Sequence, residues 1–162
     1  MTISNHCKPS VLIGCLCTLV LAACAAPGSG PPATEAEIKS MLSGSSYNTG
    51  GRGSMQSYYA PDGKKKMVGK TPEGYPIACL GTWRVAGSGY ADAFTCKTAE
   101  PSGIATKEYA DSLQVTRHNS MGGGLDYQLN TGESVGSWDV ARKINGFPKE
   151  AEFNALSKQL GL

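Results

Sequence analysis

The feature that most constrains the fold is a tight turn at Gly87-Ser88 between two segments of β character. These segments, Ile77–Ala86 and Gly89–Lys97, carry alternating side chains and several β-branched or aromatic residues. A two-residue loop with glycine at its first central position fits a type II′ turn, whose twist matches that of paired strands. We therefore predict an antiparallel hairpin in which Ala86 lies opposite Gly89.

Two cysteines face each other in this register. Counting outward from the turn places Cys79 opposite Cys96 at a non-hydrogen-bonded position, where Cα atoms approach to about 4.5 Å. That separation is within the range that a disulfide requires. Turn type and cysteine spacing are independent, and together they predict a Cys79–Cys96 disulfide that contributes about 3 kcal/mol to the free energy of unfolding.

The same register sorts the side chains, because successive residues of a strand point to opposite faces. Asp92 is the polar exception on the predicted core face and lies opposite Trp83. We expect it either to accept a buried hydrogen bond, from the indole or another donor, or to mark a ligand pocket together with Trp83 and Phe94. The structural interpretation is the one we favour. The other members of this face are Cys79, Gly81, Val85, Tyr90 and Cys96.

A short helix and a second hairpin are predicted upstream. Thr34 and Glu37 match a capping box, and apolar residues at helical spacing follow, which indicates a helix over about 35–43. The turn signal at Pro61-Asp62-Gly63 predicts strands over about 55–60 and 64–69.

A basic run, Lys64–Lys66, opens the second of these strands. Consecutive lysines must point to both faces of a strand. They either meet phosphate groups of lipids or protect an edge strand from aggregation, and we favour the edge strand.

The sequence after the central hairpin predicts its secondary structure less clearly. Residues 98–103 indicate a loop. Within 104–119 two alternatives stay open, since Lys107–Asp111 suits the start of a helix whereas Leu113–Arg117 alternates like a strand.

The C-terminal part predicts two more strands and a helix. The alternating runs 125–129 and 138–144 are expected to pair around a connection over 131–137. Phe153, Leu156 and Leu160 form the apolar stripe of a terminal helix. The fold class is therefore mainly β: a small antiparallel sheet, as a sandwich or half-barrel, with short N-terminal and C-terminal helices in a single domain over 34–162.

The N-terminal region has the parts of a secretory signal peptide. One basic side chain, Lys8, precedes an apolar run over 11–22 that ends in small residues. The run is shorter than the roughly 20 apolar residues that a membrane span needs. Its end, Leu21-Ala22-Ala23-Cys24, resembles the lipobox of bacterial lipoproteins. The alternative is an ordinary signal peptide in which Cys24 is incidental.

The lipobox resemblance implies removal of residues 1–23 and acylation of Cys24. Several acyl chains make a durable anchor, whereas one makes a marginal one. Because Ala25 rather than Asp follows the cysteine, the resemblance implies the outer membrane in a Gram-negative bacterium, and otherwise the extracytoplasmic face of the cell membrane. Residues 24–33, rich in Pro, Gly and Ala, then form a flexible tether. In that oxidising compartment Cys79 and Cys96 are the cysteines left to pair.

The mature region also resembles domain-of-unknown-function family 995. The residues that carry the resemblance are Ser43-Gly44, Tyr58–Gly63, Gly81–Val85 and Cys96, within about 34–96. It implies a compact β domain and no established activity.

Enzymatic and nucleic-acid functions find little support. Gly132–Gly136 matches the nucleophile-elbow pattern, but a strand is predicted after it and no histidine follows His118. The cysteines and carboxylates show no recognisable metal-ligand spacing, so no metal or cofactor is expected. With 15 basic and 13 acidic residues, the chain lacks the charge of a nucleic-acid binder.

Three hypotheses of function remain. The leading one is a non-enzymatic envelope lipoprotein, membrane-bound through Cys24, that binds another envelope component, either protein or lipid. The second is a lipocalin-like carrier of a small apolar ligand held by Trp83, Asp92 and Phe94. The third is a periplasmic enzyme inhibitor. A closed sheet around an apolar cavity favours the carrier, and a filled core with an exposed apolar patch favours partner binding.

Overall fold

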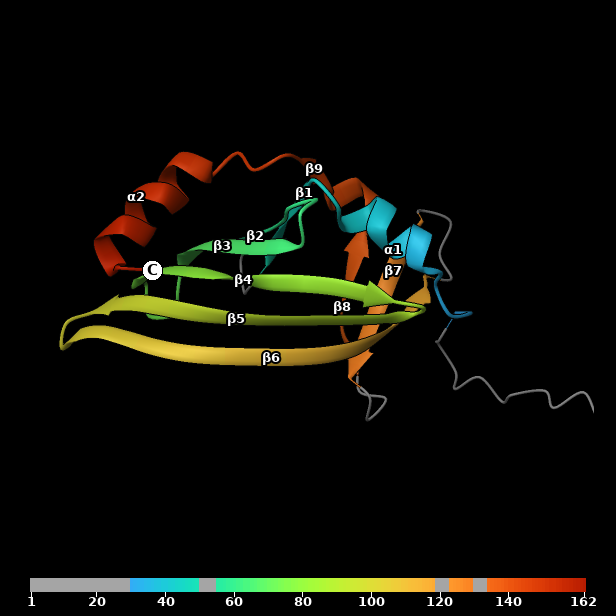
Figure 1. Ribbon diagram of the computed structural model, residues 1–162, viewed down its shortest axis with the longest axis horizontal. Helices are drawn as coiled ribbons and strands as arrows, with labels where there is room; N and C mark the ends of the chain where they lie inside the picture. The colour runs from blue at the N-terminus through green and yellow to red at the C-terminus, as the bar shows by residue number, and fades with distance from the viewer. Residues whose placement is uncertain (1–29, 50–54, 119–122, 130–133) are drawn as a thin grey trace, which may run out of the picture.

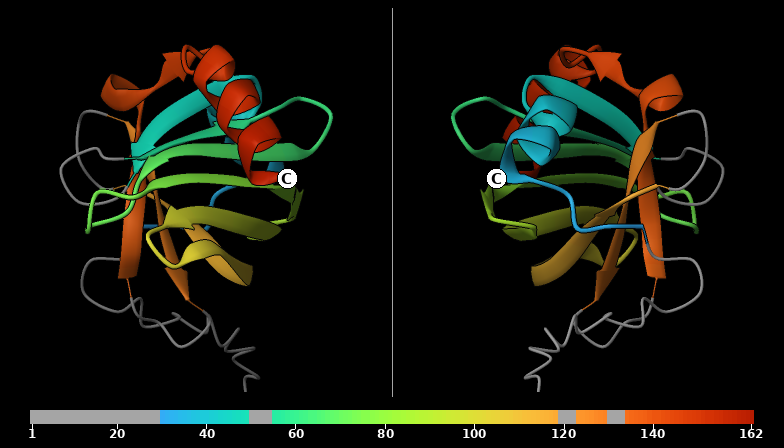
Figure 2. Two further views of the ribbon diagram at one scale, coloured as in Figure 1. Left: turned by 90° about the vertical axis from the view of Figure 1, so that its left-hand side faces the viewer. Right: turned by 90° about the vertical axis from the view of Figure 1, so that its right-hand side faces the viewer.

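The computed structural model describes residues 30–49, 55–118, 123–129 and 134–162, and its fold is a single curled antiparallel sheet. Over these residues nine strands are hydrogen-bonded in the order β8-β7-β6-β5-β4-β3-β2-β1-β9. Figure 2 shows the sheet curling into a half-barrel, with β7 and β8 crossing toward β1. The predicted mainly β fold, with its half-barrel alternative and its two short helices, is confirmed.

The elements follow one another along the chain with short connections. In order they are α1 (Glu35–Leu42), β1 (Ser45–Thr49), β2 (Met55–Tyr59), β3 (Lys64–Lys70), β4 (Pro76–Ala86), β5 (Gly89–Glu100), β6 (Gly103–Arg117), β7 (Gly124–Leu129), β8 (Ser134–Asp139), the 3₁₀ turn η2 (Val140–Arg142), β9 (Ile144–Asn145) and α2 (Glu150–Leu160).

The central hairpin forms in the predicted register. Ala86 pairs with Gly89, and Cys79 lies opposite Cys96. These cysteines form a disulfide with their Cα atoms 4.0 Å apart. Gly87 adopts φ of +59°, a left-handed conformation that a primed hairpin turn requires.

The stretch after this hairpin differs from the expectation. Strand β5 continues to Glu100, and a tight turn leads directly into the long strand β6. The predicted loop over 98–103 and the helix alternative at Lys107–Asp111 are therefore wrong. Lys, Glu and Ala in this segment have good helix propensity, but pairing with β5 along its whole length overrides it.

The two C-terminal runs pair as predicted, but β8 begins at Ser134, so the predicted connection over 131–137 is wrong from residue 134 onward. Leu125 of β7 lies opposite Trp138 of β8. The predicted strand to Ile144 is wrong because β8 ends at Asp139 and η2 redirects the chain. This redirection allows β9 to pair with β1 at the opposite edge of the sheet.

The concave face of the sheet holds the main core. Tyr59 lies near its centre, with ring centroids 5.8 Å from Trp83 and 6.3 Å from Trp138. Helix α1 contributes Ile38 and Leu42, both fully buried, to the same cluster. The predicted core face of the central hairpin is confirmed, since Cys79, Trp83, Tyr90 and Cys96 are buried there.

The convex face is covered in part by α2, which lies over β3 and β4 (Figure 1). Phe153 and Leu160 of this helix pack with Val68 and Ala78, both fully buried. These two strand residues alternate with inward-facing neighbours, so β3 and β4 are covered on both sides where α2 crosses them.

The segment before α1 is attached to the sheet. The Ala33 amide donates to the Val115 carbonyl at 3.0 Å, and the Arg117 amide donates to the Pro31 carbonyl at 2.8 Å. These residues lie within the predicted tether. Cys24 and the predicted signal peptide lie outside the described residues. No helix within the described ranges is long and apolar enough to cross a membrane.

Candidate functional site

Asp92 occupies the interior of the half-barrel as part of a polar cluster. Its side chain is 3% exposed and forms an ion pair with Lys65, whose side chain is 8% exposed. The Tyr90 hydroxyl donates to the same carboxylate oxygen, Oδ2, at 2.6 Å. Asp92 therefore accepts its buried hydrogen bonds from a lysine and a tyrosine rather than from an indole.

Trp83 lies opposite Asp92 in the strand register, yet its indole N–H donates elsewhere, to the Ala60 carbonyl at 3.0 Å. Phe94 contacts the cluster through a cation–π interaction with Lys65, whose ammonium nitrogen lies 4.5 Å from the centroid of the Phe94 ring. Of the three predicted ligand-binding residues, Asp92 lines the interior cavity described below. Trp83 and Phe94 form part of the surrounding framework.

Lys65 is the member of this cluster that sequence reasoning missed. The run Lys64–Lys66 was expected on an edge strand, but β3 lies between β2 and β4. Lys65 points inward and faces Gly81, which has no side chain. A Cβ atom at Gly81 would lie 2.1 Å from the Ala93 carbonyl oxygen and 2.4 Å from Phe94 Cβ. The bare glycine thus leaves the space across which Lys65 reaches Asp92 on β5.

Aromatic rings surround the ion pair. Lys65 Nζ lies 5.5 Å from the Tyr59 ring centroid, and the Tyr90 ring lies 5.2 Å from Trp138. Burial raises the pKa of Tyr90 far above its usual value, and Tyr59 and Asp92 nearby raise it further. The phenol therefore stays protonated and remains a hydrogen-bond donor to the carboxylate.

A small cavity reaches this cluster. Its volume is about 180 Å³, and its walls combine the polar Ser57 and Asp111 with the apolar Leu113 and Trp138. Asp92 also lines it, and the second carboxylate oxygen, Oδ1, has no hydrogen-bond partner among the described residues. A buried acceptor without a donor lowers the stability of the folded state, so Oδ1 is the atom of this cluster at which a further hydrogen bond or a chemical change would be favourable.

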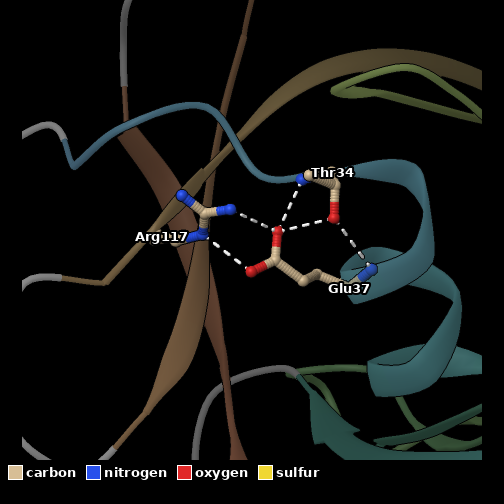
Figure 3. Close-up of polar contacts among 3 residues, drawn as sticks. All are labelled: Thr34, Glu37 and Arg117. Atoms are coloured by element: carbon tan, nitrogen blue, oxygen red, sulfur yellow. Dashed lines mark hydrogen bonds and ion pairs between the residues drawn. The ribbon is translucent and has the colours of Figure 1, made fainter.

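A second polar group ties α1 to the end of β6 (Figure 3). Glu37 forms the predicted capping box with Thr34 and also binds Arg117, with Oε1 at 2.7 Å from Nε and Oε2 at 3.0 Å from Nη2. The Arg117 guanidinium is the largest influence lowering the pKa of Glu37 to about 2, and Thr34 adds to it. One carboxylate thus caps the helix and fixes its position on the sheet.

We call the Glu37–Arg117 ion pair the clasp. The groove beside it is lined by basic residues, but most of their positive charge is paired. It is about 680 Å³ in volume and is lined by Arg117, His118 and Lys143 along with apolar side chains. Arg117 is paired with Glu37, and His118 with Asp126, which raises the pKa of the histidine. Lys143 donates to the Ser40 carbonyl at 2.7 Å. These partners leave the groove poorly suited to bind an anion.

The most exposed part of the described sheet is the first ten residues of β6. Residues 103–112 are solvent-exposed on both faces. They pair with β5 along one side, and no described strand lies along the other side until Leu113 pairs with Leu129 of β7. The structure therefore presents a long strand edge whose outward backbone groups have no strand partner among the described residues.

The turn between β5 and β6 determines which backbone groups point outward. Glu100 and Gly103 flank a two-residue loop and form a hydrogen-bonded pair, so the odd-numbered residues of β6 bond to β5. The Val115 amide, which donates toward the β5 side to the Ser88 carbonyl, follows this pattern. The N–H and C=O groups that point away from β5 therefore belong to the even-numbered residues Ile104, Thr106, Glu108, Ala110 and Ser112.

Comparisons with protein-family models, with curated proteins and with solved structures find no match for this chain. Within the described residues, no group of three or more His, Cys, Asp or Glu side chains is arranged to hold a metal ion.

Proposed function

We propose that this protein is a non-enzymatic envelope lipoprotein, anchored through Cys24, that binds a protein partner along the free edge of β6. The observation that carries the proposal is the side of residues 103–112 away from β5, along which none of the described strands pairs. A free strand edge accepts an extended segment of another chain, whose backbone supplies matching donors and acceptors. The partner class is thus a protein that offers an extended segment.

The side chains of the edge are compatible with such a partner. On the convex face, Thr106, Ala110 and Ser112 are small, and Ile104 and Glu108 are the larger exposed side chains. Lys107 and Asp111 on the inward face offer one charge of each sign, which can set the register of an incoming strand. Charged side chains on an edge also limit indiscriminate pairing.

A second copy of this chain is a poorer partner. Strand β7 occupies the edge from Leu113 onward, so two copies can use nearly all of 103–112 only in an antiparallel register centred on Lys107 or on Glu108. The first register places Lys107 directly opposite its own counterpart and the second does the same with Glu108, and like charges opposite each other are destabilising. The geometry favours a different chain.

The size of the interior cavity also favours partner binding over the carrier hypothesis. Pockets for small-molecule ligands have volumes of about 300–1,000 Å³. The interior cavity, at about 180 Å³, is smaller, and aromatic side chains fill the surrounding space. Inhibition of a periplasmic enzyme remains compatible with the proposal as one form of partner binding.

The experiment is site-specific photo-crosslinking in intact cells, with the crosslinking residue at Glu108. Ala110→Pro is the matched loss variant, because it removes an outward N–H and leaves the β5 ladder intact; proline is tolerated at such edge positions. We expect a discrete adduct at position 108 that falls at least tenfold with Ala110→Pro. A crosslinker at the exposed Asn154 of α2 serves as the control and should give no such adduct.

Two results would overturn the proposal. One is the absence of any adduct at position 108 in cells that contain the folded, membrane-bound protein. The other is an adduct whose yield is unchanged by Ala110→Pro. Retention of the Cys79–Cys96 disulfide in each variant verifies the fold.

A further inference from the structure

We propose that Lys65 and Asp92 form an intramolecular amide crosslink, joining β3 to β5 across β4. The inference is independent of the proposed partner binding. It rests on the placement of an amine and a carboxylate in contact inside a buried, aromatic part of the half-barrel.

The first support is proximity. Lys65 Nζ is hydrogen-bonded to Asp92 Oδ2, and the backbone holds the two residues there through the β3–β4–β5 register. Gly81 provides the gap across which the lysine passes. Groups held in reacting geometry behave as if present at about 10⁵–10⁸ M, which allows a reaction that is negligible between free side chains in water.

The second support is the cost of the ionic form. Two charges buried to this degree lose much of their hydration, and their attraction often fails to compensate. Oδ1 of Asp92 also lacks a partner among the described residues. Amide formation removes both charges and the unsatisfied oxygen in one step.

The reaction balances without any co-reactant. The ammonium of Lys65 and the carboxylate of Asp92 give an amide and one water. The new bond joins Nζ to Cγ, and the bond from Cγ to Oδ1 breaks. Nitrogen gives up two protons, and both leave with Oδ1 as water. The cavity of about 180 Å³ that Asp92 lines provides the space into which this water departs.

Tyr90 has a defined role in this step. Its hydroxyl donates to Oδ2, the oxygen that the amide retains. Charge develops on that oxygen when Nζ attacks Cγ, and a preorganised donor in a buried site stabilises it. The raised pKa of Tyr90 keeps the donor protonated.

The test is peptide mapping of the purified full chain, with the Cys79–Cys96 disulfide first verified as evidence of folding. After denaturation, reduction and trypsin digestion, we expect a branched peptide that joins Lys65-Lys66 to Val85–Lys97. Its mass is that of the two peptides minus one water. Lys65→Arg should abolish the branch while keeping a positive charge.

Asp92→Asn makes the test sharper. An asparagine side chain can form the same amide with loss of ammonia instead of water, so the branched peptide should persist with an identical mass. Asp92→Ala should abolish it. Recovery of linear peptides alone, with cleavage after Lys65 and an unmodified Val85–Lys97, from folded wild-type protein would show that the pair is an ion pair and overturn the proposal.

Discussion

At the scale of single residues, the fold depends on where side chains are missing as well as on where they are present. Gly81 is the clearest case, since its neighbours on β5 occupy the volume that any side chain needs. The same absence lets Lys65 reach Asp92. The predicted hairpin register places Phe94 opposite Gly81. It does not show which residue of the neighbouring strand β3 extends across the space that the missing side chain of Gly81 leaves.

Gly81→Ala should therefore be strongly destabilising. The added Cβ would lie within 2.5 Å of backbone and Cβ atoms that cannot move without distorting β5. We expect the free energy of unfolding to fall by about 2–3 kcal/mol or more, typical of overpacking in a close-packed core. Urea denaturation measures it, and Thr82→Ala on the exposed face is the control. A loss below about 0.5 kcal/mol for Gly81→Ala would show that the sheet yields at this point.

At the scale of elements, local signals predicted the helices and hairpins correctly, and long-range pairing decided the rest. The capping box and the Gly87-Ser88 turn are each encoded within a few residues. Strand β6 is different, because Lys107–Asp111 has helix-forming residues and becomes a strand through its pairing with β5. The end of β8 has a similar origin, since η2 forms where the chain must return to β1.

The attachment of α1 to β6 gives a prediction on pH. The pKa of Glu37 is lowered to about 2 from the usual 4.5, so the folded state favours its ionised form. The contribution to stability is complete above about pH 4.5 and is lost as the pH falls toward 2. We expect Glu37→Gln to lower the melting temperature at pH 7 and to weaken its pH dependence between pH 4.5 and 2, as measured by circular dichroism.

A matched variant separates this clasp from general acid sensitivity. Glu35→Gln removes an exposed carboxylate of the same helix that pairs with Lys39 and whose contact with the sheet is a hydrogen bond from the Gly87 amide at 3.3 Å, which a glutamine oxygen can still accept. We expect the melting temperature at pH 7 to fall more for Glu37→Gln than for Glu35→Gln. Equal melting temperatures for both would contradict a specific role of the Arg117 contact.

At the scale of the whole molecule, the sequence predicted a mainly β domain with a half-barrel among its forms, and it located Asp92 as the unusual interior residue. It did not reveal Lys65, because a basic run gives no sign of which lysine turns inward. Nor did it reveal the free edge of β6, since an edge is defined by the strands that fail to cover it. Those properties belong to the assembled sheet.

The proposed anchor is tested at this scale. Cys24→Ser removes the acylated residue, so we expect the protein to move from the membrane fraction to the soluble fraction, measured by fractionation and immunoblotting. A Cys79→Ser and Cys96→Ser double variant should stay with membranes, because these cysteines belong to the fold. Continued membrane association of Cys24→Ser would contradict the anchor.

The attachment of Pro31–Ala33 to β6 has a geometric consequence if Cys24 is acylated. The intervening residues can span only about 20 Å at about 3.5 Å each, whereas β6, at 15 residues, is about 50 Å long. The segment between Cys24 and Pro31 is thus shorter than strand β6. Because it is fastened at the Arg117 end, the tip at Gly103 can swing far from the bilayer, within reach of molecules that never touch the membrane.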